Sequence, residues 1–335
     1  MKKTLLSLPF ILGLILCDAC GVAFAADDAK PFIGNWALTI PGGGAGWLGV
    51  EEKDGGLKAS VLWGGGSVLP AAGAKAEDGK LVVTRVQQPK GKGGKPGKKI
   101  TETITATRDG DCLKLVTVKC AEGGKEFGRA EFTGKRIPPM PAAPDLLKVK
   151  FGEPICLFNG KDLSGWKALN PNAPNGWSAK DGILVNDAPQ EPGKHKGYVN
   201  IRTEREFEDF RLTLEVRVPK GGNSGVYLRG IYEVQVADTC GKPLDSHNMG
   251  GVYSRITPTV AAEKPAGEWQ TMDIALVDRH VTVILNGKRI VDNQPVLGCT
   301  GGALTSDEFC PGPIYLQGDH TSVDYRNIVI RPVVK

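Results

Sequence analysis

Two alternating runs joined by a short turn occupy residues 222–238. Successive side chains of a strand point to opposite faces, so Tyr227 and Arg229 of the first run share one face and apolar residues occupy the other. In the second run, Glu233 and Gln235 share a face in the same way. Such polar rows are typical either of the solvated side of an antiparallel sheet or of the wall of a cleft. Alternation alone leaves both interpretations open.

The chain before residue 137 repeats this two-residue period, with Gly-rich turns between short runs. No segment between residues 31 and 136 has a convincing helical period, which predicts a small antiparallel β-barrel or sandwich. The tripeptide Gly34-Asn35-Trp36 resembles the GxW opening of lipocalin-like barrels. This region has no acid pair, histidine or metal-ligand spacing, and we therefore expect an accessory role for it.

A proline-rich break at residues 137–144 separates this region from a second set of alternating runs. Neither a helix nor a central strand tolerates so many prolines, and the length of the chain also suggests two domains. We therefore expect an all-β protein with an accessory β domain at residues 26–136, a linker at 137–147 and a second β domain at 148–335.

The first 25 residues predict a cleavable signal peptide. Two lysines precede an apolar run from Leu5 to Leu16, and Ala23-Phe24-Ala25 fits a cleavage site of small residues. The alternative is a lipoprotein signal that uses Cys17 or Cys20, but the residues before each cysteine fit it poorly. No later apolar stretch is long enough to span a membrane. We therefore expect a periplasmic or secreted protein.

The charge of the chain gives little indication of a polyanionic partner. The formal net charge is +5, and several lysines gather in the Gly-rich run at residues 87–99. That run has no interleaved aromatic residues on which bases could stack. We interpret it as a solvated hairpin loop and expect no nucleic-acid partner.

The mature chain has six cysteines, and an even number in an exported protein suggests disulfides. Six cysteines allow fifteen connectivities. Two pairs are close in the sequence, and the third follows from what is left. The expected pairs are Cys112 with Cys120, Cys299 with Cys310, and Cys156 with Cys240.

Several blocks of the second region resemble one known family. They are LFNGKDLSGW, NSGVYLRGIYEVQVADT, PAGEWQTMDIALVDRHVTVILNGKRIVDN and GPIYLQGDHTSVDYRNIVI, in this order. Together they are similar to the 3-keto-disaccharide hydrolase family, from about Pro154 to Pro332. The resemblance implies a concanavalin A-like jelly-roll sandwich, with one sheet packed and the concave face of the other available to a sugar.

The resemblance also implies a chemistry. A 3-keto group on a hexose makes the C2 proton acidic, so a base can remove it and the enolate can expel the C1 substituent. Water then adds to the unsaturated product, which gives net hydrolysis. Such a reaction needs a base and a positive group at the enolate oxygen. Arg229 or a divalent metal ion would fill the second role, and no other cofactor is implied.

Strand parity and position in the family motifs together select the candidate site residues. Glu233 and His320 are the candidate bases or ligands, and Arg229 is the candidate for the enolate oxygen. The candidate substrate-binding residues are Tyr227, Gln235, Asp238, His247, Gln317 and Asp319. The candidate metal ligands are Glu233, His247 and His320, although their spacing does not define a metal site.

Three functions are compatible with this pattern. The first is an exported enzyme that cleaves 3-keto glycosides, with a sugar 3-dehydrogenase as an upstream partner. The second is a non-catalytic carbohydrate-binding jelly-roll protein of the cell envelope, and the third is a scaffold. Ionisable side chains on the expected concave face favour the enzyme. A retaining glycosidase is disfavoured, because Glu233 is followed on its own face by Gln235 rather than by a second Glu.

Overall fold

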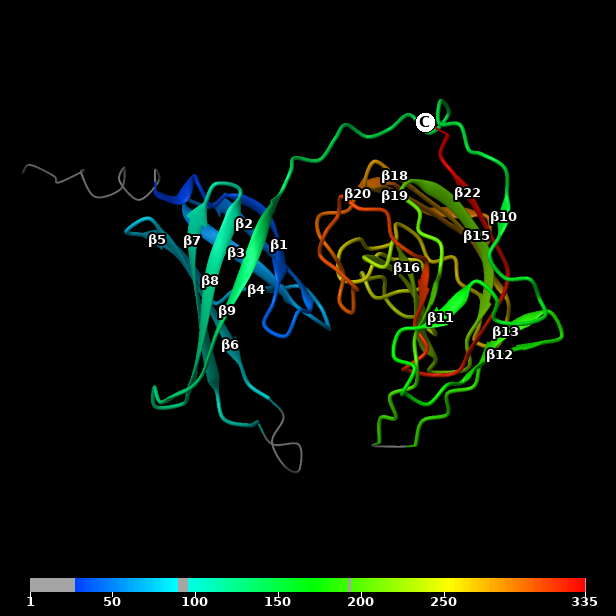
Figure 1. The fold of residues 1–335 in the computed structure, drawn as a ribbon, viewed down its shortest axis with the longest axis horizontal. Helices are drawn as coiled ribbons and strands as arrows, with labels where there is room; N and C mark the ends of the chain where they lie inside the picture. Colours follow the sequence, from blue (N-terminus) through cyan, green and yellow to red (C-terminus); the bar gives the residue numbers. More distant parts are fainter. Residues whose placement is uncertain (1–27, 90–95, 192–193, 335) are drawn as a thin grey trace, which may run out of the picture.

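A computed structural model describes residues 28–89, 96–191 and 194–334. The expected signal peptide and residues 90–95 of the basic run lie outside the described residues. The described residues form two bodies that lie side by side, and a strand-free connection links them along one edge (Figure 1).

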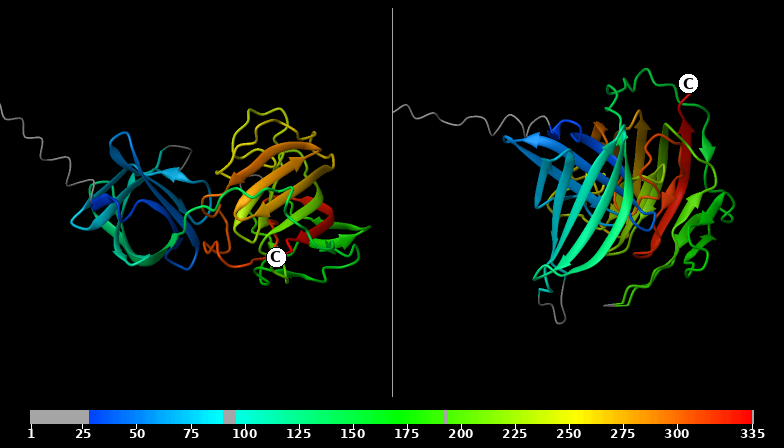
Figure 2. Two further views of the ribbon diagram at one scale, coloured as in Figure 1. Left: turned by 90° about the horizontal axis from the view of Figure 1, so that it is seen from above. Right: turned by 60° about the vertical axis from the view of Figure 1, so that its left-hand side comes forward.

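The first body is a single curled antiparallel sheet. Its strands in the described residues are β1 (Gly34–Thr39), β2 (Ala45–Lys53), β3 (Gly56–Trp63), β4 (Leu69–Pro70), β5 (Gly73–Glu77), β6 (Lys80–Gln87), β7 (Ile100–Asp109), β8 (Cys112–Ala121) and β9 (Glu126–Ile137). They follow the order β4-β3-β2-β1-β9-β8-β7-β6-β5, so the two edge strands are consecutive in the chain. Figure 2 shows the sheet closing into a ring, so of the two expected forms, barrel or sandwich, the structure has the barrel.

The period of the sequence accounts for the barrel interior. On β8, Leu113 and Leu115 are buried while Lys114 between them is exposed. Trp36 of the GxW tripeptide is fully buried, and its ring nitrogen donates a hydrogen bond to the Phe32 carbonyl at 2.8 Å. Trp36 therefore packs as a plug inside the barrel.

The second body consists of two antiparallel sheets. One contains β10 (Ile155–Cys156), β12 (Trp177–Lys180), β13 (Ile183–Asn186), β15 (Phe210–Arg217), β18 (Gln270–Val277), β19 (His280–Leu285), β20 (Lys288–Pro295) and β22 (Val323–Pro332). The other contains β11 (Trp166–Ala168), β14 (Ile201–Thr203), β16 (Asn223–Leu228), β17 (Tyr232–Ala237) and β21 (Tyr315–Leu316). Buried side chains from both sheets form one apolar core, as expected for a jelly-roll sandwich.

Strands β16 and β17 form the hairpin that the sequence predicts at residues 222–238. Their register places Tyr227 directly opposite Glu233, and Val226 opposite Val234. The predicted faces are therefore correct. The prediction that the polar face is open is incorrect, because nearly every residue of both strands is buried. Gly301 lies over this face, since its carbonyl accepts a hydrogen bond from the Tyr227 hydroxyl.

The connection between the two bodies lies against the second body. Arg279 donates to the carbonyl oxygens of Pro138 and Pro139, at 3.3 and 2.9 Å. Asn293 donates to the Pro144 carbonyl at 2.9 Å. Within the described residues, no helix is both long enough and apolar enough to cross a membrane.

The expected disulfides do not form. In the described part of the chain, the free cysteines are Cys112, Cys120, Cys156, Cys240, Cys299 and Cys310. Strand geometry explains the error for the first pair. Cys112 and Cys120 lie near opposite ends of β8, about 26 Å apart at a rise of about 3.3 Å per residue, whereas bridged Cα atoms lie within about 7 Å.

Candidate functional site

A cavity of about 290 Å³ lies at the polar face of the β16–β17 hairpin. Several strands and loops of the second body contribute to it, and so does the loop after β3 of the barrel. Its lining residues are Gly65, Gly66, Asn200, Asn223, Tyr227, Glu233, Tyr253, Gly301, Gly302, Tyr315, Gln317, Asp319 and His320.

Two stacked tyrosines and a carboxyl group form the most buried part of the cavity wall. Tyr227 is 1% exposed, Glu233 4% and Tyr315 3%. The rings of Tyr227 and Tyr315 lie nearly parallel with centroids 4.1 Å apart, because β16 and β21 pair with these residues in register. Glu233 reaches the same place from β17, opposite Tyr227.

The hydrogen bonds of Tyr227 indicate that Glu233 carries a proton. The Tyr227 hydroxyl oxygen is 2.7 Å from the Gly301 carbonyl oxygen and 3.0 Å from Glu233 Oε2. A phenol has one proton, which the shorter contact assigns to the carbonyl. The longer contact is then a hydrogen bond if the neutral Glu233 carboxyl group donates to the phenol oxygen.

Burial supports the same protonation state. Removal from water raises the pKa of Glu233 from 4.5 to about 8, and the negative Asp319 adds to this effect. A hydrogen bond donated by Tyr227 to the ionised carboxylate would oppose the shift, without cancelling it. At neutral pH Glu233 is therefore mainly an uncharged acid that can give up a proton.

The opposite charge state prevails at the more exposed part of the cavity. His320 Nδ1 lies 2.7 Å from Asp319 Oδ1, and the side chains are 42% and 29% exposed. Burial acts to raise the pKa of Asp319, but the hydrogen bond with His320 and the charge of that ring outweigh it and lower the pKa. As an acceptor, an ionised Asp319 favours the imidazole tautomer that carries its proton on Nδ1, and in that tautomer Nε2 can accept a proton.

Asn200 holds this pair in place. Its amide oxygen accepts hydrogen bonds from the backbone N–H groups of Gly318 and Asp319, at 2.7 and 3.1 Å. Its amide nitrogen lies 3.1 Å from the Tyr315 hydroxyl. The carboxylate–histidine pair and the stacked tyrosines therefore share one positioning side chain.

The cavity brings together five of the nine candidate residues. They are Tyr227, Glu233, Gln317, Asp319 and His320. Sequence reasoning missed the other side chains that line it, namely Asn200, Asn223, Tyr253 and Tyr315. Tyr315 and Asn223 lie within the motif blocks, two and four positions from a selected residue. Their position on strands that pair with β16 or belong to it was the signal that could have identified them.

Arg229 does not line the cavity, so the prediction that it faces the substrate is wrong. Strand parity fails at this residue because β16 ends at Leu228 and Arg229 adopts a turn conformation with φ of 55°. Its guanidinium group instead donates to the carbonyl of Glu308 and lies over the ring of Tyr232. It is 4% exposed and lies outside the residues that line the cavity.

Three further candidates also lie outside the cavity lining. Gln235 shares the face of Glu233, but its side-chain oxygen accepts a hydrogen bond from the N–H of Val236. Asp238 accepts one from the N–H of Gly221. His247 binds Ser67 of the barrel at 2.9 Å, and the predictions that these three side chains contact substrate are not supported by their positions.

The expected metal set does not converge. Among the described residues, no three His, Cys, Asp or Glu side chains gather closely enough to hold a metal ion. Glu233 and His320 line the cavity, whereas His247 lies outside its lining. The candidate set therefore does not fit a three-ligand metal centre, and a metal requirement stays a prediction.

Gly225 makes room for the buried carboxyl group, and we expect Gly225→Ala to displace it. A Cβ atom at this position would lie 2.3 Å from Glu233 Oε1. Overpacking of this kind costs about 1–3 kcal/mol, which a fall in thermal unfolding temperature would register. Gly128→Ala on β9 is the matched control, because its Cβ would meet atoms only at 3.7 Å or more. Equal unfolding temperatures for both variants would contradict this account.

Comparison with known proteins identifies relatives of this chain. A relative from Bacteroides thetaiotaomicron, named 3-keto-disaccharide hydrolase, is 25% identical over 166 residues, which are 41% of this chain and 57% of that protein. The match thus spans little more than half the length of that relative.

Two solved structures show weaker likenesses. One, from Parabacteroides distasonis, is 21% identical, with a TM-score of 0.44, over 54% of this chain and 94% of that one. A carbohydrate binding module from Bacillus subtilis is 11% identical, with a TM-score of 0.34, over 50% of this chain and 95% of that one.

A family model matches more than half of the chain, over residues 153–331. Its description is a 3-keto-alpha-glucoside-1,2-lyase-like domain. Every residue that lines the cavity lies within this match except Gly65 and Gly66. The chain belongs to the family of proteins with a 3-keto-alpha-glucoside-1,2-lyase-like domain.

Proposed function

We propose that this protein cleaves 3-keto glycosides at the glycosidic bond. The observation that carries the proposal is the pairing, in one cavity, of a neutral acid with an ionised carboxylate–histidine pair. The cavity holds Glu233 at one place and Asp319 with His320 at another. Two titratable groups with opposed pKa shifts are the usual arrangement of an acid and a base that act on one substrate.

In the proposed reaction, Nε2 of His320 removes the proton from C2 of the sugar. The electron pair of the C2–H bond forms an enolate with the C3 carbonyl, and Asp319 stabilises the resulting imidazolium. The C1–O bond then breaks as the C1=C2 double bond forms. Glu233 is the acid that delivers its proton to the departing oxygen, so that the leaving group departs as a neutral alcohol.

Water completes net hydrolysis in a second stage. Its oxygen adds to C1 and keeps one proton as the new hydroxyl group, its other proton goes to the ionised Glu233, and His320 returns the first proton to C2. The neutral Glu233 also replaces Arg229 in the role that the sequence suggested for that residue, which is to stabilise the enolate oxygen. Before it releases its proton, a buried carboxylic acid can donate a hydrogen bond to an oxygen that gains negative charge.

The same burial argues against a purely binding role. A carbohydrate-binding module stacks sugar rings on exposed aromatic platforms. The stacked tyrosines of this cavity are only 1% and 3% exposed, so neither ring offers an open face to a sugar. Export to the periplasm or medium, and a sugar 3-dehydrogenase that supplies the substrate, belong to the proposal as its cellular setting.

The proposal is tested with a 3-keto glucoside that carries a chromogenic leaving group. The unoxidised glucoside is the matched control, because it lacks the acidified C2 proton. We expect release of the chromogen from the keto sugar alone. Release from both compounds, or from neither, would contradict the proposed chemistry. A parallel incubation with a chelator tests the metal prediction, since loss of release would assign a metal to the reaction.

A further inference from the structure

The barrel supplies part of the cavity wall. Gly65 and Gly66 line it although they lie far outside residues 153–331. They belong to the segment Gly64–Val68, between β3 and β4, which we call the roof loop. The loop lies directly on the second body, because the N–H of Gly302 lies 3.2 Å from the Gly64 carbonyl oxygen. A Cβ atom on Gly301 would lie 2.1 Å from the Gly66 carbonyl oxygen, so the two backbones touch.

Two side-chain contacts hold the roof loop at this place. Ser67 Oγ lies 2.9 Å from His247 Nε2, and the N–H of Val68 donates to Ser254 Oγ at 2.9 Å. The His247 ring in turn packs edge-on against Tyr253, with centroids 4.7 Å apart. Because Tyr253 lines the cavity, the loop is connected to the wall through a short chain of contacts.

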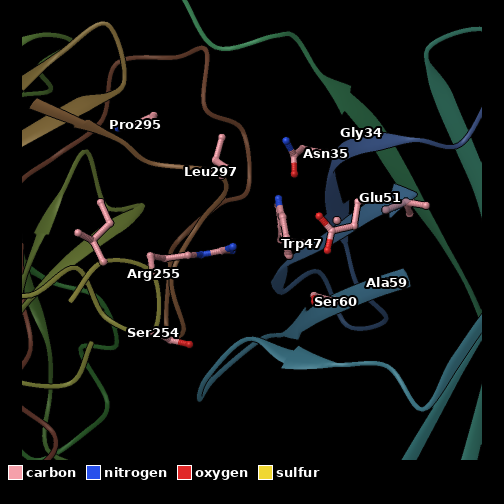
Figure 3. Close-up of a pocket in the computed structure, with 13 residues that line it drawn as sticks. Gly34, Asn35, Trp47, Glu51, Ala59, Ser60, Ser254, Arg255, Pro295 and Leu297 are labelled. Carbon is pink, nitrogen blue, oxygen red and sulfur yellow. The ribbon is translucent and has the colours of Figure 1, made fainter. Parts of the chain in front are cut away.

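A second cavity, of about 410 Å³, marks the same junction (Figure 3). In Figure 3, Arg255 of the second body reaches toward Trp47 of β2. The guanidinium carbon lies 4.2 Å from the centroid of the indole ring, and the group donates to the Cys299 carbonyl at 2.6 and 3.2 Å. Ser306 also donates to the Leu38 carbonyl at 2.8 Å. The roof loop is therefore held in place by many contacts between the barrel and the second body, not only by its own two hydrogen bonds.

We infer that the barrel is a specificity element, and that its roof loop restricts the enzyme to 3-keto sugars at the end of a glycan. This inference rests on the proposed function. A concave jelly-roll face without a roof is an open groove that a polysaccharide can cross. Here the loop forms one side of a cavity of about 290 Å³, which is at the small end of ligand pockets and suits a terminal unit better than a continuing chain.

Glycine is suited to the roof position because it presents only backbone. A Cβ on Gly65 would meet no atom within 4 Å, and its φ is not positive, so a side chain fits there without strain. Gly66 differs, since its φ of 80° penalises any replacement. Gly65 is therefore the position at which the volume of the cavity can be reduced while the fold is kept.

The test compares Gly65→Leu with Gly56→Leu. Gly56 also lies in open space without a positive φ, but on β3 outside the cavity lining. Substrates are a 3-keto disaccharide with the keto unit at the non-reducing end and a trisaccharide with the keto unit in the interior. We expect the wild type to cleave the terminal unit at least about 10-fold more efficiently than the interior one. Gly65→Leu should lower kcat/KM on the terminal unit at least about 10-fold, through KM, with an unchanged unfolding temperature.

Ser67→Ala gives an independent reading if Gly65→Leu does not fold. Loss of the contact with His247 should loosen the roof loop. The kcat/KM values for the terminal and the interior keto unit should then differ less than in the wild type. Equal cleavage of both units by the wild type, or equal kinetics of the two leucine variants, would overturn the inference and leave the proposed function standing. A wild type that cleaves neither 3-keto substrate would instead refute the proposed function, and the inference with it.

Discussion

Glu233→Gln is expected to reduce kcat on 3-keto glycosides by about 10²–10⁴-fold, the usual contribution of a general acid. The amide keeps the shape of the carboxyl group and can still bond to the Tyr227 hydroxyl, but it has no acidic proton to deliver. The chromogenic 3-keto glucoside measures this loss directly. In the wild type, kcat should fall as the pH rises above about 8, because Glu233 then loses its proton.

Stability provides a second readout for the same substitution. Between pH 4.5 and about 8 the folded protein keeps a proton on Glu233 that the unfolded chain has released. Raising the pH through this window therefore favours unfolding, by up to about 1.4 kcal/mol per pH unit. Glu233→Gln should remove this loss, so the variant gains stability relative to the wild type as the pH rises.

Glu308→Gln is the matched control for the loss of kcat. Glu308 is also a buried carboxyl group with a raised pKa, again mainly because of desolvation, but it lies outside the cavity lining. It pairs with Arg279 at 3.3 Å, so its replacement should lower stability and leave kcat largely unchanged. If Glu233→Gln retained turnover, or if both variants lost it equally, the acid role of Glu233 would be wrong.

His320→Ala is expected to have a comparable effect on kcat, again about 10²–10⁴-fold, because it removes the base that takes the C2 proton. Its side chain is 42% exposed, so the unfolding temperature should change little. Exchange of the C2 proton with deuterated solvent reports the base step separately from bond cleavage. We expect His320→Ala to abolish that exchange.

A neighbouring histidine provides the control. The His195 ring packs against His320 with centroids 5.7 Å apart, but it does not line the cavity. His195→Ala should therefore keep both exchange and turnover within a few fold. For Asp319→Asn, the rates of C2 proton exchange and of turnover should lie between those of His195→Ala and His320→Ala. The substitution disturbs the tautomer of His320 without removing the ring. Normal exchange in His320→Ala would assign the base to another group.

The sequence was sufficient for the all-β class and for the residues that share a face within each strand of the hairpin. Alternation placed Tyr227 on one face of its run, and Glu233 with Gln235 on one face of the next, and a single sequence displays this two-residue period directly. The position of Tyr227 opposite Glu233 depends on the register of the two strands, which comes from the structure.

Features that depend on contacts between distant segments were not predictable in this way. The two-residue period predicted that Arg229 shares the face of Tyr227. That prediction extended β16 one residue past its end at Leu228, and Arg229 adopts a turn conformation instead. The raised pKa of Glu233 arises from burial, and the wall of the same cavity includes Gly301, which is 68 positions away in the chain. The contribution of Gly65 was hidden for the same reason, since a glycine in a barrel loop carries no chemical signal of its own.

The connection at residues 138–144 gives the contact between the two bodies a thermodynamic advantage. Its carbonyl oxygens are bonded to Arg279 and Asn293, so the barrel is tethered at short range. Docking of the barrel is then an intramolecular event with a high effective concentration, and it loses little translational entropy. The polar and stacking contacts of the junction therefore act on a barrel that is already held beside the cavity, which favours its seated position.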